Sequence, residues 1–296
     1  MNEFDVVIIG GGAAGLSAAL VLSRARRRVA VVDAGRPRNA PAAHMHGFLG
    51  SDGLPPGELL AAGRKEVEGY GGVIIPGTVQ AVSGAAPAFT VGLADGELRA
   101  RRVLVTTGLT DVIPDLPGAR ERWGRDLLHC PYCHGYEVRD RPLGVLGGNP
   151  EAVAHALLIR EWSADLVFFT HGTVLDEAQR ERLRSRGVAV VDHAVTDLVV
   201  TGDELTGVRL DTGEVVPRAA VFVRPRFVAN SGLLTGLGCA TDGNGWVTVD
   251  GTGQTSVPGV FAAGNAVNPR ATVITAAGEG SAAAIAVNTS LVEESL

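Results

Sequence analysis

The segment DVVIIGGGAAG, residues 5–15, joins a continuous apolar run to a glycine-rich turn. The apolar run is typical of a strand buried inside a parallel sheet. The turn has the spacing G-x-G-x-x-G, in which Gly10 allows a tight turn, Gly12 lets a pyrophosphate approach the backbone, and Gly15 lets a helix pack closely on the strand. The segment therefore predicts the first strand and turn of a dinucleotide-binding unit.

The residues after this turn complete the expected unit. Residues 16–23 are rich in alanine and leucine and predict a helix. At the N-terminus of this helix, the amides of Ala13 and Ala14 are expected to donate hydrogen bonds to phosphate. Residues 29–32 predict a second strand, which ends at Asp33. A carboxylate at this position accepts hydrogen bonds from ribose hydroxyls, so the pattern indicates a bound dinucleotide rather than a glycine-rich loop without a ligand.

A second unit of the same kind starts near the middle of the chain. Residues 143–146 predict a strand, residues 147–152 (GGNPEA) a turn, the residues up to about Trp162 a helix, and residues 166–169 another strand. The repeat predicts an α/β fold with two Rossmann-like, three-layer dinucleotide-binding domains, the second inserted in the first.

The expected domain boundaries follow from this repeat and from residues 227–232, where the chain turns back toward the first domain. The first domain is expected to be discontinuous and to comprise residues 1–110 and 233–296. The second is expected to comprise residues 111–232.

The second turn departs from the pattern that binds a nicotinamide dinucleotide. Asn149 stands where a glycine would let the backbone approach pyrophosphate. Residues 170–172 (THG) replace the basic residues that pair with the 2′-phosphate of NADPH, and neither arginine nor lysine occurs between Arg160 and Arg180. The sequence thus predicts a nicotinamide-type fold for which NADPH is a doubtful ligand.

The charge and hydropathy patterns exclude several partners. The formal net charge is −6, and the one dense basic run, residues 24–28 (RARRR), lies where a solvated helix C-terminus is expected. Nucleic acids and anionic membranes call for clustered positive charge, so neither is an expected partner. No apolar stretch reaches the ~18 residues that span a membrane, and the N-terminus shows no signal peptide. We therefore expect a soluble, cytoplasmic protein.

The densest group of reactive side chains lies in residues 129–137 (HCPYCHGYE). Cysteines at positions i and i+3, here Cys130 and Cys133, can form a small disulfide ring and exchange it with thiols. If Cys133 begins a helical turn, the helix dipole favours its thiolate. His134 beside it can exchange protons near neutral pH. The third cysteine, Cys239, is expected to be a small core residue.

Three other interpretations of the C-x-x-C-H pattern stay open at this point. The pattern is also that of covalent c-type haem attachment, which requires export and an enclosing helical shell. A zinc site needs about four ligands, and because no second C-x-x-C supplies them, we expect no bound metal. The third interpretation is two reduced cysteines without a role.

Together these motifs resemble those of the low-molecular-weight thioredoxin reductase-like flavoproteins, over essentially the whole chain. Residues 255–265 (TSVPGVFAAGN) are similar to the family's second flavin motif, and residues 106–108 (TTG) to its mid-chain flavin-contacting turn. The resemblance implies FAD as the cofactor and a homodimer as the assembly. Asn265 replaces the family's usual aspartate, and an amide can still bond a hydroxyl of the flavin side chain. The expected helix over residues 273–288 would present its N-terminus to the flavin.

The motifs and the resemblance together imply one set of flavin contacts. The set is Gly10, Gly12, Ala13, Ala14, Gly15, Asp33, Arg38, Asn39, Val79, Thr107, Gly108, Gly264, Asn265, Thr272 and Val273.

The cysteine motif is similar to that of the dithiol oxidase branch, which includes the enzymes that close the disulfides of gliotoxin and holomycin. Thioredoxin reductases usually carry aspartate directly after the second cysteine, where this chain has His134. The resemblance implies that Cys130 is the interchange cysteine that meets the substrate, that Cys133 is the cysteine nearer the flavin, and that His134 is the acid–base residue.

The implied reaction is oxidation of a small-molecule dithiol to a disulfide. A substrate thiolate attacks Cys130, the second substrate thiol closes the product, and electrons pass from Cys133 to FAD. His134 takes up protons, and molecular oxygen is the terminal acceptor and leaves as hydrogen peroxide. The alternative function is an NAD(P)H-dependent disulfide reductase acting on thioredoxin or a related protein. A third is a redox sensor without turnover.

Overall fold

The computed structural model describes residues 2–294 and residue 296, which form two compact units. Unit 1 comprises the chain up to Ala40, Phe48–Thr110 and the chain from Phe227 onward; unit 2 comprises Pro41–Gly47 and Asp111–Arg226. The second boundary therefore falls at Arg226, whereas the sequence placed it at residue 232. The reason is local bonding, because the amide of Asn230 donates to the carbonyl of Gly108 in unit 1 (3.0 Å).

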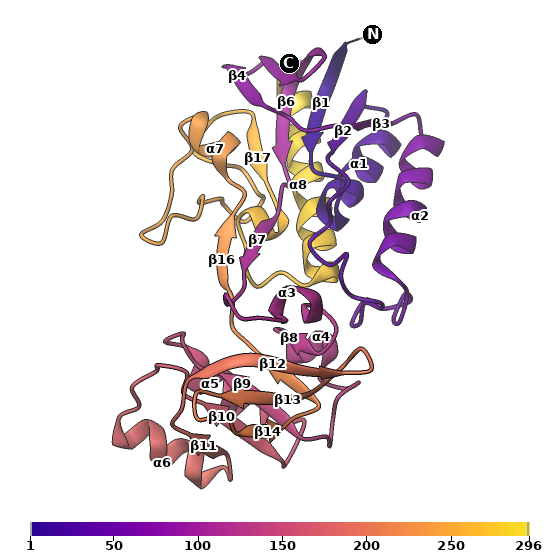
Figure 1. The fold of residues 1–296 in the computed structure, drawn as a ribbon. Coiled ribbons are helices and arrows are strands. Elements are labelled where there is room, and N and C mark those ends of the chain that lie inside the picture. The colour runs from indigo at the N-terminus through magenta and orange to yellow at the C-terminus, as the bar shows by residue number, and fades with distance from the viewer. Residues whose placement is uncertain (1, 295) are drawn as a thin grey trace. The chain divides into compact units, whose positions relative to one another are not determined.

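The core of unit 1 is a sheet whose parallel part has the strand order β3-β2-β1-β6-β17, with β5 and β4 added antiparallel beside β6 (Figure 1). Its strands are β1 (Glu3–Ile9), β2 (Val29–Asp33), β3 (Val73–Pro76), β4 (Ala81–Ala85), β5 (Ala88–Leu93), β6 (Gly96–Val105) and β17 (Val260–Ala262). Its helices are α1 (Ala13–Arg24), α2 (Pro56–Gly69), α7 (Gly232–Gly236), the short 3₁₀ helix η1 (Gly264–Ala266) and α8 (Val273–Glu293).

Alternate side chains of β1 point to opposite faces of the sheet and pack in two separate hydrophobic layers, as in any pleated strand that is buried on both faces. Val6 and Ile8 pack with α1, α2 and α8 on one face. Val7 and Ile9 pack on the other face, in the layer that contains Cys239. Cys239 is thus a buried core residue, as the sequence predicts.

Helices α1 and α8, indigo and yellow in Figure 1, lie against each other on the first of these faces. A Cβ atom at Gly280 of α8 would stand 2.0 Å from the carbonyl oxygen of Ala14, so glycine alone allows this approach. The contact holds α8 against the first turn of α1, where the predicted phosphate-binding amides lie.

Unit 2 has three layers. A parallel sheet of order β11-β10-β9-β15-β8 carries α5 and α6 on one face, and the antiparallel sheet β12-β13-β14 on the other. The strands are β8 (Leu127–Leu128), β9 (Leu143–Leu146), β10 (Leu166–Phe169), β11 (Ala189–Val191), β12 (Val195–Thr201), β13 (Glu204–Leu210), β14 (Val215–Pro217) and β15 (Ala220–Phe222). The helices are α3 (Ala119–Arg122), α4 (Pro131–His134), α5 (Ala152–Ile159) and α6 (Glu177–Ser185).

Two paired strands, β7 (Leu109–Val112) and β16 (Arg226–Ala229), carry the chain out of unit 1 and back. Each unit is Rossmann-like, so the α/β fold with two dinucleotide-binding units is confirmed. No helix in residues 2–294 combines the length and apolar character needed to cross a membrane.

Candidate active site

The Gly10 turn follows β1 and leaves an open approach for a ligand. Gly10 has φ 109°, and a Cβ there would lie 2.5 Å from the carbonyl oxygen of Thr106. A Cβ at Gly15 would lie 1.9 Å from the carbonyl oxygen of Gly10, so this glycine sets the distance between α1 and the turn. A Cβ at Gly12 would meet nothing within 4 Å. The backbone is therefore closely packed on its inner side and open at Gly12.

Helix α1 begins at this turn with Gly12 as its N-cap residue. No side chain caps it, and its first turn contains no acidic residue. The first amides of a helix have no partner within the helix, and the helix dipole favours an anion near them. The start of α1, with Ala13 and Ala14, is therefore suited to a phosphate group.

The other predicted residues of unit 1 gather at the carboxyl edge of its parallel sheet. Asp33 ends β2, Thr107 and Gly108 follow β6, and Gly264 and Asn265 follow β17. Because neighbouring parallel strands end at the same edge, these residues share it with the Gly10 turn. Val79 differs: it lies in the segment that connects β3 to β4, and its side chain is buried in the hydrophobic core.

The carboxylate of Asp33 is bonded from two sides. Its Oδ1 accepts from the amides of Gly11 (3.2 Å) and Gly35 (3.3 Å), and its Oδ2 accepts from Nη2 of Arg64 on α2 (3.0 Å). A carboxylate has about four acceptor positions, so these bonds orient Asp33 and still leave acceptor capacity for a ribose hydroxyl. The ribose contact itself stays a prediction.

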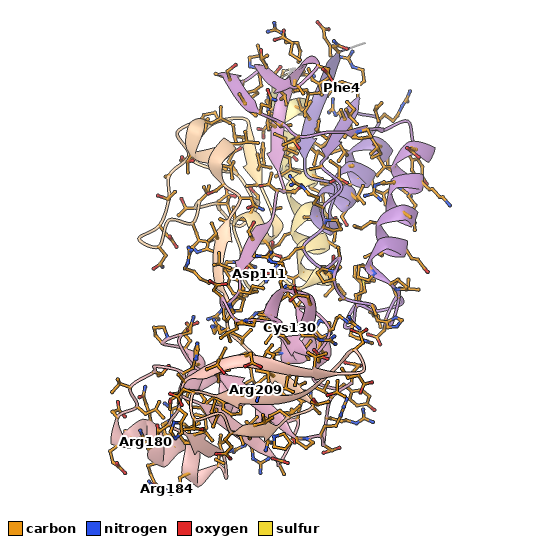
Figure 2. The ribbon with its side chains drawn as sticks, in the orientation of Figure 1. Phe4, Asp111, Cys130, Arg180, Arg184 and Arg209 are labelled. Atoms are coloured by element: carbon orange, nitrogen blue, oxygen red, sulfur yellow. A yellow bond between two sulfur atoms is a disulfide. The ribbon has the colours of Figure 1, made fainter. Side chains whose placement is uncertain are left out.

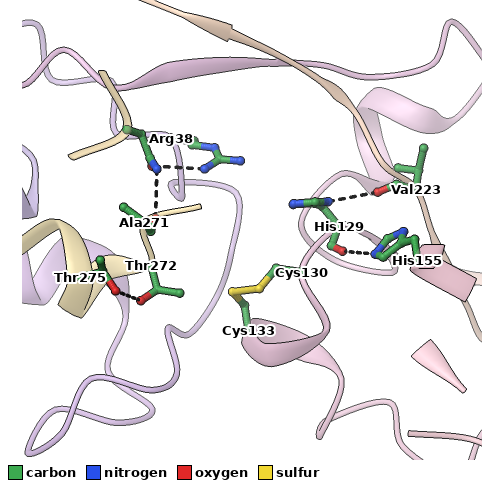
Figure 3. Close-up of a disulfide and its surroundings, with 10 residues drawn as sticks. Arg38, His129, Cys130, Cys133, His155, Val223, Ala271, Thr272 and Thr275 are labelled. Carbon is green, nitrogen blue, oxygen red and sulfur yellow. Dashed lines mark hydrogen bonds between the residues drawn. A yellow bond between two sulfur atoms is a disulfide. The ribbon is translucent and has the colours of Figure 1, made fainter. Parts of the chain in front are cut away.

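Asn265 organises the loop between β17 and α8. Its Nδ2 donates to the carbonyl oxygens of Asn268 (2.8 Å) and Ala271 (3.0 Å), and its Oδ1 accepts from Nη1 of Arg38 (3.2 Å), as drawn in part in Figure 3. Both amide hydrogens of Asn265 are thus used within the protein. Its predicted flavin contact is left to its oxygen, which can accept a second hydrogen bond.

Helix α8 starts directly after this loop, with Thr272 as its N-cap residue and Val273 as its first residue. Its first turn contains no acidic residue. The N-terminus of α8 is therefore suited to negative charge, as expected beside a reduced flavin.

The other two residues predicted in this region, Arg38 and Asn39, lie in one half-buried loop. The guanidinium of Arg38 lies over the ring of Phe227, 5.2 Å from its centroid.

These features of unit 1 fit FAD. The open Gly12 backbone and the uncapped start of α1 suit a pyrophosphate, the Asp33 carboxylate suits a ribose, and the start of α8 suits an anionic ring. The individual contacts of the residues named from the sequence stay predictions.

The Cys130–Cys133 pair is a disulfide in unit 2, with Cα atoms 5.2 Å apart (Figures 2 and 3). It follows β8, at the carboxyl edge of that unit's parallel sheet. Cys130 is the N-cap residue of α4, and its carbonyl oxygen accepts from the amides of Cys133 (3.2 Å) and His134 (3.1 Å). Cys133 is therefore the third residue of a four-residue helix and does not begin it, so the helix-dipole argument for its thiolate is weakened.

His134, the last residue of α4, is largely buried. Burial lowers the pKa of His134; the carboxylate of Glu137 opposes this shift, and His46 adds to it. His46 Nε2 and Glu137 Oε1 lie 3.4 Å apart. A neutral imidazole at this position can accept a proton from a thiol, which is the role that the sequence predicts.

The backbone just before Cys130 is held by two hydrogen bonds (Figure 3). The ring of His129 donates from Nδ1 to the carbonyl oxygen of Val223 (3.3 Å), which follows β15. The carbonyl oxygen of His129 accepts from Nε2 of His155 on α5 (2.9 Å). The dithiol motif is therefore tied both to the sheet and to the helix layer of unit 2.

The amides of the second glycine turn, after β9, are hydrogen-bonded within unit 2. The amide of Gly148 donates to Oγ1 of Thr173 (2.6 Å), and the amide of Glu151 donates to Oδ1 of Asn149 (2.8 Å). The amide of Ala152 donates to the carbonyl oxygen of Asn149 (3.0 Å). Pro150 has no amide hydrogen.

Charge at this turn is also unfavourable for a phosphate. Glu151 is the N-cap residue of α5 and forms an ion pair with Arg224, so a carboxylate already stands at the helix N-terminus. His171 uses Nδ1 to accept from the amide of Val195 (3.1 Å). Arg180, the first arginine or lysine after Arg160, lies on α6, where Figure 2 labels it. It pairs with Asp192.

Several contributing residues have no signal in the sequence. Arg64, Asn230, His155 and His46 belong to no motif, and Glu137 lies in the 129–137 motif without a predicted role; the roles of all five depend on contacts with residues distant in the chain. The sequence could have pointed to Glu137 as a partner of His134, because it lies one helical turn after that residue.

The fold and the site define a flavoprotein built from two dinucleotide-binding units, with a redox-active C-x-x-C disulfide in the second. The chain belongs to the pyridine nucleotide-disulphide oxidoreductase family, whose model matches residues 4–280. It is an FAD-dependent oxidoreductase.

Individual relatives agree with this assignment. Thioredoxin reductase sirT of Leptosphaeria maculans is 30% identical, over 96% of this chain and 93% of its own length. Thioredoxin reductase tcpT of Claviceps purpurea is 34% identical, over 89% and 87%. The crystal structure of HlmI has a TM-score of 0.97 at 57% identity, over 99% of this chain and 94% of that chain. The resemblance drawn from the sequence and FAD as the cofactor are confirmed.

Proposed function

We propose that this flavoprotein is a dithiol oxidase that forms a disulfide in a small-molecule dithiol and uses molecular oxygen as terminal acceptor. The observation that carries the proposal is the closed second turn, whose amides are bonded internally and whose helix α5 has Glu151 as its N-cap residue. A reductase receives electrons from a nicotinamide dinucleotide held at such a turn, whereas an oxidase needs no ligand there.

The chemistry assigned to the dithiol motif is two thiol–disulfide exchanges. A substrate thiolate attacks Cys130, a bond forms between these two sulfurs, and Cys133 leaves as a thiolate. The second substrate thiol then attacks the substrate sulfur, which closes the product disulfide and releases Cys130. Two electrons and two protons remain on the protein, and His134 accepts a proton from a thiol. FAD, held by unit 1, supplies the two-electron acceptor through which oxygen is reduced to hydrogen peroxide.

The resemblance of HCPYCHGYE to the dithiol oxidase branch supports this proposal, as does the 57% identity to HlmI. The alternative is an NAD(P)H-dependent disulfide reductase, which the names of the sirT and tcpT relatives favour. We further propose a cytoplasmic homodimer, which cell fractionation and light scattering would test.

Turnover tests the proposal directly. In air, with dithiothreitol and a panel of other small dithiols, the flavin-loaded protein should consume oxygen and release hydrogen peroxide in equal amounts. Cys130→Ser and Cys133→Ser should each lower this rate by on the order of a thousandfold, because each removes a partner of the exchange. Cys239→Ser is the matched control and should keep the rate. Thioredoxin reduction at the expense of NADPH, without oxygen uptake from dithiols, would contradict the proposal.

A further inference from the structure

His155 is a buried titratable side chain of unit 2 that the proposed chemistry does not use. It lies on α5 with 4% of its surface exposed. Its ring stands 5.8 Å from the ring of His129 and meets the ring of Phe222 edge-on at 6.2 Å. The imidazole therefore lies inside the core, between the helix layer and the parallel sheet.

The hydrogen bond to His129 fixes the tautomer of His155. A carbonyl oxygen only accepts, so Nε2 of His155 must carry the hydrogen that bridges the 2.9 Å to the oxygen of His129. Burial is the main cause that lowers the pKa of His155 to about 4, so the ring is neutral at physiological pH. In the neutral ring Nδ1 then carries the lone pair.

Packing alone does not explain a histidine at this position. Nδ1 of His155 is one of three buried side-chain polar atoms that have no hydrogen-bond partner within the described residues. A buried polar atom without a partner destabilises the folded state, and an apolar ring of similar shape would avoid this cost. An apolar ring has no Nε2–H donor. The hydrogen bond that Nε2–H donates to His129 is therefore what a histidine contributes at this position.

The donor acts one residue before the reactive disulfide. Nε2–H of His155 holds the carbonyl of the His129–Cys130 peptide, while Nδ1–H of His129 holds the same residue to Val223. Two anchors on one residue hold the plane of the His129–Cys130 peptide, and α4, whose N-cap residue is Cys130 with φ −94°, holds the other side of Cys130; together they set the direction of its Cα–Cβ bond. Thiol–disulfide exchange is sensitive to this direction, because the incoming sulfur must approach Cys130 as Cys133 leaves.

We propose that His155 is a positioning residue for Cys130, holding the His129–Cys130 peptide so that the Cys130 sulfur meets an attacking thiolate in a constant orientation. The inference rests on the proposed function only in taking Cys130 as the attacked sulfur. It assigns to α5, the helix of the nucleotide-type unit, a part in the dithiol chemistry.

The test measures the exchange step alone. The oxidised, flavin-loaded protein is mixed with dithiothreitol without oxygen, quenched with an alkylating agent at successive times, and analysed by mass spectrometry for labelled Cys133, the thiol that attack on Cys130 releases. We expect His155→Phe, which keeps a flat ring without the donor, to slow labelling about tenfold, the factor that one lost hydrogen bond represents. His155→Gln, whose amide can donate to the same carbonyl, should stay within about threefold of the wild-type rate. If His155→Phe does not fold, His155→Met fills the space without a donor and takes its place.

Ile159→Val is the matched control, because it loosens the packing of the same helix without touching His129. It should lower stability and leave the exchange rate unchanged. The proposal is wrong if the Phe variant exchanges at the wild-type rate, if the Gln variant is as slow as the Phe variant, or if Ile159→Val is equally slow. Because the assay needs neither a natural substrate nor oxygen nor NADPH, it gives the same answer whether the protein proves to be an oxidase or a reductase.

Discussion

The Gly10 turn of unit 1 and the Gly147 turn of unit 2 share a backbone plan but differ at the ligand-binding amides. In both, the first glycine donates its amide across the sheet, Gly10 to Val32 and Gly147 to Phe169, each at 2.8 Å. In both, a Cβ on that glycine would strike a backbone carbonyl oxygen, that of Thr106 after β6 for Gly10 and that of Thr170 after β10 for Gly147. The fold of the turn is therefore retained in both units.

The difference lies in what occupies the helix N-terminus. Neither helix has a side-chain cap or an acid in its first turn, but the N-cap residue of α1 is Gly12, whereas that of α5 is Glu151, whose carboxylate is paired with Arg224. Thr173 and Asn149 take the amides of the second turn. A Rossmann-like unit can therefore keep its packing glycines while its own side chains accept hydrogen bonds from the amides of the glycine turn.

The largest expected effect comes from closing the first turn. In Gly15→Ala a new Cβ would lie 1.9 Å from the carbonyl oxygen of Gly10, so the turn must move away from its present geometry. We expect loss of bound FAD, read as loss of flavin absorbance after purification. Gly147→Ala is the matched control, since its Cβ would lie 2.0 Å from the carbonyl oxygen of Thr170. It should destabilise unit 2 and retain FAD; equal flavin loss in both variants would show that the Gly10 turn has no special part in binding FAD.

A smaller effect is expected in the stability of unit 2, which should depend on pH. The pKa of His155 is lowered to about 4, by burial first and then by the charges of His129 and Arg224, although its backbone hydrogen bond opposes this. Between about pH 6.5 and 4 the unfolded chain binds a proton that the folded chain does not, so stability falls as the pH falls. The loss is roughly 3 kcal/mol, present in full near pH 4 and absent above pH 7.

Urea unfolding across this pH range, followed by a signal from unit 2, measures this loss. His155→Gln should flatten the dependence, because glutamine does not titrate. An unchanged slope in that variant would place the pH dependence on another group.

Removing the ribose carboxylate should weaken the first site without abolishing it. Asp33→Ala removes the acceptor of the Gly11 amide and the partner of Arg64, together with the predicted ribose contact. We expect FAD affinity to fall about 10- to 100-fold, as loss of one or two hydrogen bonds to a charged group implies. Reconstitution of the apoprotein, followed by flavin fluorescence, gives the dissociation constant. Asp95→Ala, at an exposed turn, is the control, and a Kd for Asp33→Ala equal to that of the control would remove Asp33 from the site.

The smallest effect is expected at the corresponding place in unit 2. Glu151→Gln removes the exposed ion pair with Arg224, which contributes less than about 1 kcal/mol to stability. FAD content should not change, and NADPH should still not bind, because Asn149 and Thr173 continue to occupy the turn. Calorimetric titration with NADPH checks this, and tight binding by the variant would mean that Glu151 alone closes the site.

Much of the fold was predictable because its signals are local. The apolar run before Gly10, the strand ending at Asp33 and the repeat at Gly147 each predict an element that the structure contains. The weakness of the second turn was also visible, at Asn149. What the sequence did not show was the reason, since Thr173 and Arg224 reach the turn from distant parts of the chain.

The residues of the candidate site were predictable only where they lie next to one another in the chain. Cys130, Cys133 and His134 form a local motif, whereas the anchor at His155 depends on how α5 packs on the sheet. The second domain boundary was misplaced by a few residues because the pairing of Asn230 with Gly108 has no pattern in the sequence. The start of α4 was left open, because C-x-x-C does not specify which cysteine is the N-cap residue, and the structure gives that place to Cys130.

The source of the electrons is the central question that the two turns raise, and an anaerobic titration answers it most directly. The flavin-loaded protein is titrated without oxygen, first with NADPH and, in a separate sample, with dithiothreitol. The closed second turn predicts that NADPH leaves the flavin colour unchanged, that the dithiol bleaches it, and that air restores it with release of hydrogen peroxide. Prompt bleaching by NADPH would contradict the account.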